Sequence, residues 1–201
     1  MSKYKTISTG GEAQYRVLGS RHIGLAYPVS SEEEIKTIID TLWKEHHSAT
    51  HVCYAWRLGW DKSRFRANDD GEPGGTAGKP ILGQIQSFDL TNILICVIRY
   101  YGGTKLGTGG LIDAYKTTAK LTIEASTIEE RMVKDHYSLS FSYDQMPVIM
   151  KLLKDLNMEK IAAHFENECK VEFLLDMDQE GRLHKGLEDL DGVELTHVGR
   201  R

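Results

Sequence analysis

The chain has 201 residues, of which 40% are apolar and 27% are charged, and it carries a formal net charge of −4. This composition excludes wholesale disorder, and the length suffices for one large domain or two small domains with real cores. The negative charge excludes a chain that is basic throughout, so any polyanionic partner must meet a local basic patch.

The cysteines and the apolar runs indicate the compartment. Cys53, Cys96 and Cys169 are odd in number and lack CxxC spacing, which argues against a disulfide framework or a structural zinc site. The N-terminal stretch has no apolar signal segment, and the aliphatic run from Ile93 to Ile98 is far shorter than the ~20 residues that span a bilayer. We therefore expect a cytoplasmic protein with no cofactor and no membrane partner. The oligomeric state stays open.

The first part of the chain carries clear strand and helix signals. Residues 12–29 mix β-branched and aromatic residues with glycines and predict one or two strands. Over residues 30–47, Ser31 and Glu34 form a capping-box pattern, and aliphatic residues follow at helical spacing, so we expect a helix. Residues 50–58 predict a strand by their β propensity.

A long polar connection follows over residues 59–75. It exceeds the ~12–15 residues beyond which structureless loops tend to be functional or disordered. The arginines in and next to it could grip phosphates, or could simply keep a mobile loop soluble. A helix is predicted to begin between Thr76 and Pro80 and to end near Gln86, because proline is tolerated in a first turn.

The aliphatic run at residues 92–101 predicts a strand that is buried on both faces. It ends in a second glycine-rich stretch, residues 102–110. Residues 111–126 then show the spacing of an amphipathic helix.

From residue 136 the order of elements changes. Strands are predicted at 136–143 and 193–198, helices at 144–157 and 180–190, and two strands around a turn at 160–177. The resulting order, βαββαβ, is the ferredoxin-like pattern. With the charged stretch 129–135 as a linker, we expect an α+β protein with two domains, residues 1–134 and 135–201.

Two glycine loops, residues 68–80 and residues 102–110, each precede a predicted helix. The first N–H groups of a helix lack partners and carry the positive end of its dipole, so glycines that leave them bare favour an anion site. Lys79 lies in the first glycine loop, and Arg99 and Lys105 flank the second. If the loops converge, they form one pocket with several N–H donors and three cations. Neither loop matches a P-loop or a dinucleotide motif, and the glycines could instead serve only tight turns.

The acids of the first glycine loop, Asp69, Asp70 and Glu72, have more than one interpretation. They could bind a metal, act as a general base, or form a solvated turn that caps the next helix. His51 and Cys53 share one face of the predicted strand, which also leaves open a zinc site or a Cys/His catalytic pair. No HExxH motif accompanies them, so we expect no metal.

Four stretches around these residues resemble, in order and spacing, the signature blocks of the IMPACT/YigZ family. They read GSRHIGLAYPVSSEEE, HSATHVCYAWRLG, DDGEPGGTAGKPIL and IRYYGGTKLGTGGLIDAY. The resemblance implies a two-layer α/β N-terminal domain like the second domain of a small-subunit ribosomal protein. It also implies a ferredoxin-like C-terminal domain similar to the last domain of elongation factor G.

The resemblance further implies a set of site residues on the two loops and the strands beside them: His51, Asp69, Asp70, Glu72, Gly75, Thr76, Gly78, Lys79, Arg99, Tyr100, Gly102, Gly103, Lys105, Gly107 and Gly109. Two positions depart from the family pattern. Gly74 replaces a frequent serine, which removes a hydroxyl that a catalytic site could use, and Thr104 replaces a branched aliphatic residue.

Three functional hypotheses remain. The first is a non-catalytic protein that presents the pocket to RNA or to a ribosome-associated protein, based on the paired helix starts with Lys79, Arg99 and Lys105. The resemblance implies a link to translation control. The second is a hydrolase or phosphotransferase that uses the same pocket with His51, Asp70 or Glu72 for proton transfer. The third is a protein-interaction module formed by residues 136–201. The residues favour binding over catalysis, because no complete catalytic triad is present.

Overall fold

The computed structural model describes residues 3–165 and 169–200. It contains two units: the first is Tyr4–Arg131, and the second combines Lys3 with the residues from Met132 onward. The first unit is built on a five-stranded sheet in the order β2-β3-β6-β4-β5, and every neighbouring pair is antiparallel. Its strands are β2 (Glu12–Val17), β3 (Ser20–Pro28), β4 (His51–Leu58), β5 (Arg64–Asn68) and β6 (Ile93–Tyr100).

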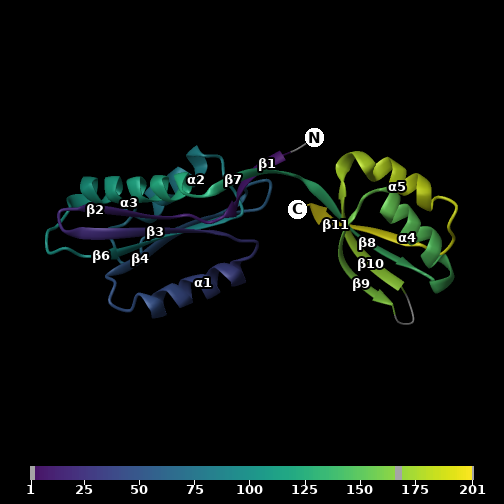
Figure 1. Ribbon diagram of the computed structural model, residues 1–201, viewed down its shortest axis with the longest axis horizontal. Helices are drawn as coiled ribbons and strands as arrows, with labels where there is room; N and C mark the ends of the chain where they lie inside the picture. The colour runs from purple at the N-terminus through teal and green to yellow at the C-terminus, as the bar shows by residue number, and fades with distance from the viewer. Residues whose placement is uncertain (1–2, 166–168, 201) are drawn as a thin grey trace. The chain divides into compact units, whose positions relative to one another are not determined.

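Strand β6 lies at the centre of this sheet, which explains its continuous aliphatic sequence. Helices α2 (Gly78–Ser87) and α3 (Gly107–Glu124) pack on one face, and α1 (Glu32–Glu45) packs on the other (Figure 1). The mixed α/β fold class is thus confirmed. The first unit has three layers instead of the expected two. Ile35 and Leu42 of α1 form a separate core with the face of the sheet opposite α2 and α3.

Helix α1 begins where its sequence predicts. The Ser31 side chain accepts a hydrogen bond from the Glu34 backbone N–H at 3.2 Å. The Glu34 carboxylate returns to the backbone N–H of Ser30, at 2.8 Å, rather than to that of Ser31. The cap is therefore one residue wider than the standard box.

Two boundaries in the first unit differ from expectation. The polar connection 59–75 contains β5, an edge strand whose exposed arginines conceal the usual apolar alternation. Helix α3 begins at Gly107, so part of the second glycine loop is its first turn. Glycine has low helix propensity, and here tertiary packing overrides that preference.

A further pair of strands lies outside the main sheet. Strand β1 (Lys3–Thr9) pairs with β7 (Thr127–Met132). The stretch 129–135, expected as a linker, therefore consists largely of β7 and the start of β8 (Lys134–Phe141). No helix among the described residues is long and apolar enough to cross a membrane.

The second unit has the ferredoxin-like order of elements. Its antiparallel sheet, β11-β8-β10-β9, is covered on one face by two helices whose aliphatic residues form a single core (Figure 1). A short 3-10 turn precedes each helix. The turn expected between its two middle strands falls on residues 166–168, outside the described residues. The elements are β8 (Lys134–Phe141), α4 (Met146–Asp155), β9 (Glu159–Phe165), β10 (Cys169–Asp176), α5 (Glu180–Leu187) and β11 (Glu194–Arg200).

Candidate functional site

Three polar side chains lie side by side across the middle of the five-stranded sheet. Arg99 of β6 is in register with His22 of β3 on one side and with His51 of β4 on the other. Directly paired residues project from the same face of a sheet, and here that face packs against α2 and α3. The row therefore lies beneath the two helices that follow the glycine loops.

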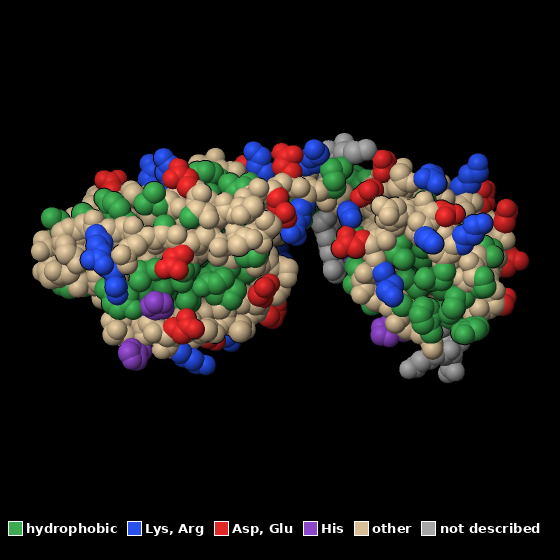
Figure 2. Space-filling view, in the orientation of Figure 1, with side chains coloured by type: hydrophobic (Ala, Val, Ile, Leu, Met, Phe, Trp, Pro, Cys, Tyr) green, Lys and Arg blue, Asp and Glu red, His purple; other side chains and the backbone are tan. Residues whose placement is uncertain are grey.

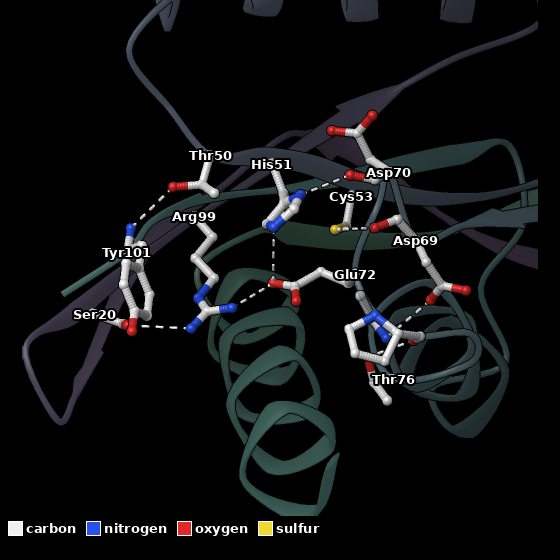
Figure 3. Close-up of polar contacts among 12 residues, drawn as sticks. Ser20, Thr50, His51, Cys53, Asp69, Asp70, Glu72, Thr76, Arg99 and Tyr101 are labelled. Carbon is white, nitrogen blue, oxygen red and sulfur yellow. Dashed lines mark hydrogen bonds and ion pairs between the residues drawn. The ribbon is translucent and has the colours of Figure 1, made fainter. Parts of the chain in front are cut away.

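Glu72 of the first glycine loop reaches into this row (Figure 3). Its Oε1 accepts hydrogen bonds from Arg99 Nη1 at 2.6 Å and from the Tyr115 hydroxyl of α3 at 2.8 Å. His51 Nε2 lies 3.8 Å from the same oxygen. The Glu72 and Arg99 side chains are 3% and 6% exposed, so this is a buried ion pair that links the loop, the sheet and α3.

Burial also changes the protonation of the neighbouring groups. Desolvation, together with the positive charge of Arg99, lowers the pKa of His22 to about 4, so this histidine is neutral near pH 7. Both ring nitrogens of His22 lack a hydrogen-bond partner among the described residues. Burial raises the pKa of Cys53 and that of Tyr115 well above their usual values. Neither group ionises near neutral pH.

Asp69 occupies the N-terminus of α2. Its carboxylate accepts hydrogen bonds from the backbone N–H groups of Gly75 at 2.8 Å, Ala77 at 3.0 Å and Gly78 at 2.8 Å. Burial alone would raise the pKa of Asp69, but these three donors and nearby Lys79 outweigh it and hold the pKa below its usual value. The expectation that the glycines of this loop leave their amides bare is therefore wrong for Gly75 and Gly78.

The remaining polar groups of the first glycine loop also bond within the protein. The Asp70 carboxylate accepts from the Val52 N–H at 2.6 Å, and the Asp70 carbonyl accepts from His51 Nδ1 at 2.7 Å. The Cys53 thiol donates to the Asp69 carbonyl at 3.0 Å. His51 and Cys53 thus anchor the loop backbone instead of forming a reactive pair. No group of three or more His, Cys, Asp and Glu residues within the described ranges is placed to hold a metal ion.

A cavity of about 340 Å³ lies where the two glycine loops meet. Glu72 and Pro73 contribute from the first loop, and Lys105 and the start of α3 contribute from the second. The convergence expected from the sequence therefore occurs. The full lining is Glu72, Pro73, Arg99, Tyr101, Lys105, Leu106, Gly107, Thr108 and Leu111.

Several expected site residues do not line this cavity. Lys79 is exposed on α2 beside Gly75, and the Thr76 hydroxyl donates to the Pro73 carbonyl. Tyr100 lies on the opposite face of the sheet, where its hydroxyl meets His46 Nδ1 at 2.7 Å. Successive strand residues alternate between faces, so Arg99 and Tyr100 cannot share one site. Asp69, Asp70, Gly75, Gly78, Gly102, Gly103 and Gly109 are also absent from the lining.

Glycine is required at Gly102 for a packing reason. A Cβ there would lie 1.9 Å from the backbone carbon of Gly19, so the two chain segments could not approach this closely. The Gly102 N–H also donates to the Ser20 hydroxyl at 3.2 Å. This position holds the second glycine loop against β3.

The N-terminus of α3 differs from that of α2. Asp69 accepts from three N–H groups at the start of α2, whereas no side chain in the described ranges accepts from the first N–H groups of α3. Gly107 has a φ of 69°, and a Cβ at Gly107 or Gly109 would meet only open space. Lys105, which precedes the helix, is exposed and forms no ion pair within the described part of the chain. Positive charge is thus available at this end of the cavity.

Sequence reasoning missed several residues in the lining of the cavity or in contact with it. Tyr101 lies just past the end of β6, and the resemblance implied its neighbour Tyr100 instead. Leu106 and Leu111 add apolar wall, and Tyr115 reaches the Glu72 carboxylate. Leu111 and Tyr115 are four residues apart and so share one face of α3, and this spacing could have identified both.

Figure 2 shows acidic and basic side chains interspersed over the visible face of the first unit. This agrees with the net charge of −4. Attraction for an anion must therefore come from a local group such as the start of α3 with Lys105.

Comparison with known proteins identifies the family. The Impact N-terminal domain matches residues 18–123, more than half of the chain. The chain is 30% identical to IMPACT family member YvyE of Bacillus subtilis, over 98% of this chain and 94% of that protein. It is 37% identical to IMPACT family member YigZ of Escherichia coli over 73% of each. A solved structure described as a hypothetical protein aligns with a TM-score of 0.81 at 28% identity, covering 98% of both chains. The chain belongs to the IMPACT family.

Proposed function

We propose that this protein is a translation-associated regulator that binds RNA through the cavity between the two glycine loops. The association with translation rests on membership of the IMPACT family, because the resemblance of the signature blocks to this family implies a link to translation control. The cavity supports the choice of RNA, because it combines a positive helix end with a free lysine.

The start of α3 is the observation that carries this proposal. Its N–H groups receive no side-chain cap, and Lys105 stands next to them without an acidic partner in the described residues. Backbone N–H groups at a helix N-terminus together with a lysine are a common cradle for phosphate.

The buried ion pair of Arg99 and Glu72 limits the positive charge that the cavity presents to an anion. Arg99 lines the cavity, but its charge is balanced by Glu72 at 2.6 Å. Lys105 is then the cation that can neutralise a phosphate. Binding should be modest and should fall as salt rises, because each neutralised phosphate releases a counterion.

No second function is favoured by the geometry. A hydrolase or phosphotransferase would need an acid free to move a proton. Asp69 and Asp70 bind backbone N–H groups, and Glu72 Oε1 binds Arg99 and Tyr115.

Two lysines provide a matched test. Lys79 and Lys105 are both exposed and both lie beside a glycine-rich helix start, but only Lys105 lines the cavity. Lys105→Ala should weaken binding of a labelled single-stranded RNA several-fold and lower the salt slope by about 1, whereas Lys79→Ala should leave both near wild type. Fluorescence anisotropy over a salt series measures both quantities.

Two results would contradict the proposal. One is a wild-type protein that shows no RNA association even at low salt. The other is equal weakening by Lys79→Ala and Lys105→Ala, because that would place the contact outside the cavity.

A further inference from the structure

Tyr101 is an exposed aromatic side chain at the rim of the cavity. Tyr101 is 47% exposed and directly follows the last residue of β6. The backbone N–H donates to the Thr50 hydroxyl at 3.2 Å, and the Arg99 guanidinium lies 5.5 Å from the ring centroid (Figure 3). The ring is therefore positioned from both ends while part of it remains open to solvent. Exposed aromatic rings beside cationic groups are typical platforms for unpaired bases.

The walls of the cavity are more apolar than a phosphate requires. Pro73, Leu106 and Leu111 line it together with Tyr101. Its volume of about 340 Å³ is at the lower end of the range for small-molecule sites, about 300–1,000 Å³. This size and polarity suit one flat organic group rather than a duplex backbone.

Glu72, which lines the cavity, has one carboxylate oxygen that can accept a hydrogen bond from a ligand. Glu72 Oε1 accepts from Arg99 and Tyr115, but Oε2 accepts no hydrogen bond from the part of the chain that the structure describes. The Glu72 side chain is only 3% exposed and lines the cavity, so a ligand that displaces water from Oε2 must supply a donor in its place, because a carboxylate oxygen left without a partner is costly. A phosphodiester cannot satisfy this oxygen, because its own oxygens only accept. A ligand that covers Oε2 must therefore also carry a donor, which in a ribonucleotide is a base N–H group or a ribose hydroxyl.

We propose that the cavity holds one unpaired nucleobase that presents an N–H group. Its ring stacks on Tyr101, its N–H donates to Glu72 Oε2, and the adjoining phosphate lies at Lys105 and the start of α3. This inference rests on the proposed RNA binding and makes it specific to single strands, because pairing would hide both the base face and the N–H edge.

Oligouridine is a suitable probe, because every residue offers the same base and the same imino N–H. We would measure the affinity of the full chain for a short labelled oligouridine, for the same strand annealed to oligoadenylate, and for a strand methylated at every uracil N3. Methylation removes the N–H donor and keeps the phosphates. We expect the single strand to bind at least several-fold more tightly than either the duplex or the methylated strand.

The protein side of the test uses Tyr101. Tyr101→Ala should weaken binding of the single strand by about 5- to 150-fold without changing the salt slope, and Tyr101→Phe should restore it, because base stacking needs the ring and not the hydroxyl. A thermal melt of Tyr101→Ala checks that the variant is folded. Lys105→Ala should show the opposite signature, a changed salt slope.

The outcomes separate this inference from the proposed function. If wild type binds no RNA, the proposed function fails. If wild type binds RNA but Tyr101→Ala binds equally well, or the duplex binds as tightly as the single strand, the RNA contact stands and the base pocket is overturned. Equal affinity for the methylated strand would overturn the donor contact to Glu72.

Discussion

The two glycine loops look alike in sequence and differ in what their helices offer to a ligand. At α2, the Asp69 carboxylate already takes three backbone N–H groups, so the helix end is filled by the protein itself. At α3, no side chain of the described residues accepts a hydrogen bond from the first N–H groups. A glycine-rich turn before a helix is thus insufficient to predict an anion site, because an acid elsewhere in the loop can occupy it first.

The ion pair and hydrogen bond of Glu72 connect the first glycine loop to Arg99 of β6 and to Tyr115 of α3. Removing these contacts should have the largest effect on stability. Glu72→Ala leaves the buried Arg99 charge without its partner, so we expect a loss of about 3–5 kcal/mol in the free energy of unfolding. Urea unfolding followed by tryptophan fluorescence reports the first unit, because Trp43, Trp56 and Trp60 all lie in it. The exposed acid Glu33 supplies the control Glu33→Ala, and similar losses in both variants would refute the role of the ion pair.

The buried row under both loops should make the first unit sensitive to acid. The pKa of His22 is about 4 when folded, against 6.5 when exposed, so the unfolded chain binds the extra proton between these values. The stabilisation is fully present above pH 6.5 and is lost as the pH falls toward 4, a loss of about 2–3 kcal/mol. We would measure the free energy of unfolding across this pH range for wild type, His22→Phe and the exposed-site control His47→Gln. Its dependence on pH should become flatter in His22→Phe alone. An unchanged profile would contradict the assignment.

Removing Asp69, whose carboxylate caps the start of α2, tests the difference between the two helix starts. Asp69→Ala should cost about 1–3 kcal/mol, because three N–H groups lose their acceptor. Asp69→Asn keeps one oxygen and should cost less. Since the pKa of Asp69 is lowered on folding from its ordinary value of 3.8, its contribution is present above pH 3.8 and is lost as the pH falls further. Hydrogen exchange at Gly75, Ala77 and Gly78 should accelerate in Asp69→Ala, and unchanged protection there would contradict the cap.

Filling α3 in the same way is the converse experiment, with a small effect on stability. Thr108 is exposed in the first turn and lines the cavity. Thr108→Asp should stabilise the fold by about 0.3–1 kcal/mol through the helix dipole and should weaken RNA binding. The isosteric control Thr108→Asn should do neither to the same extent. Tighter RNA binding by Thr108→Asp would contradict an anion site at this helix.

Much of the architecture follows from local patterns. The cap of α1, the continuous aliphatic run of β6 and the βαββαβ order of the second unit all have strong local signals. Strand β5 lacks one, because its outer edge is unpaired and its arginines replace the apolar positions that identify buried strands.

The candidate site was only partly predictable for a related reason. Glu72, Arg99, Lys105 and Gly107 were identified and do meet at one cavity. Tyr100 was expected from the family resemblance. Which of Tyr100 and Tyr101 lines the cavity depends on the face of each side chain near the end of β6, and strand ends are among the least certain features of a sequence. The capping role of Asp69 depends on how the loop folds back on α2, and residue order does not determine that path.

A phosphate titration followed residue by residue tests the difference between the two helix starts most directly. With inorganic phosphate added to the isotope-labelled chain, we expect the backbone amide resonances of Gly107, Thr108 and Gly109 to shift. Those of Gly75, Ala77 and Gly78 should stay in place, because Asp69 already occupies their N–H groups. Shifts confined to the α2 amides, or none at α3, would contradict the account.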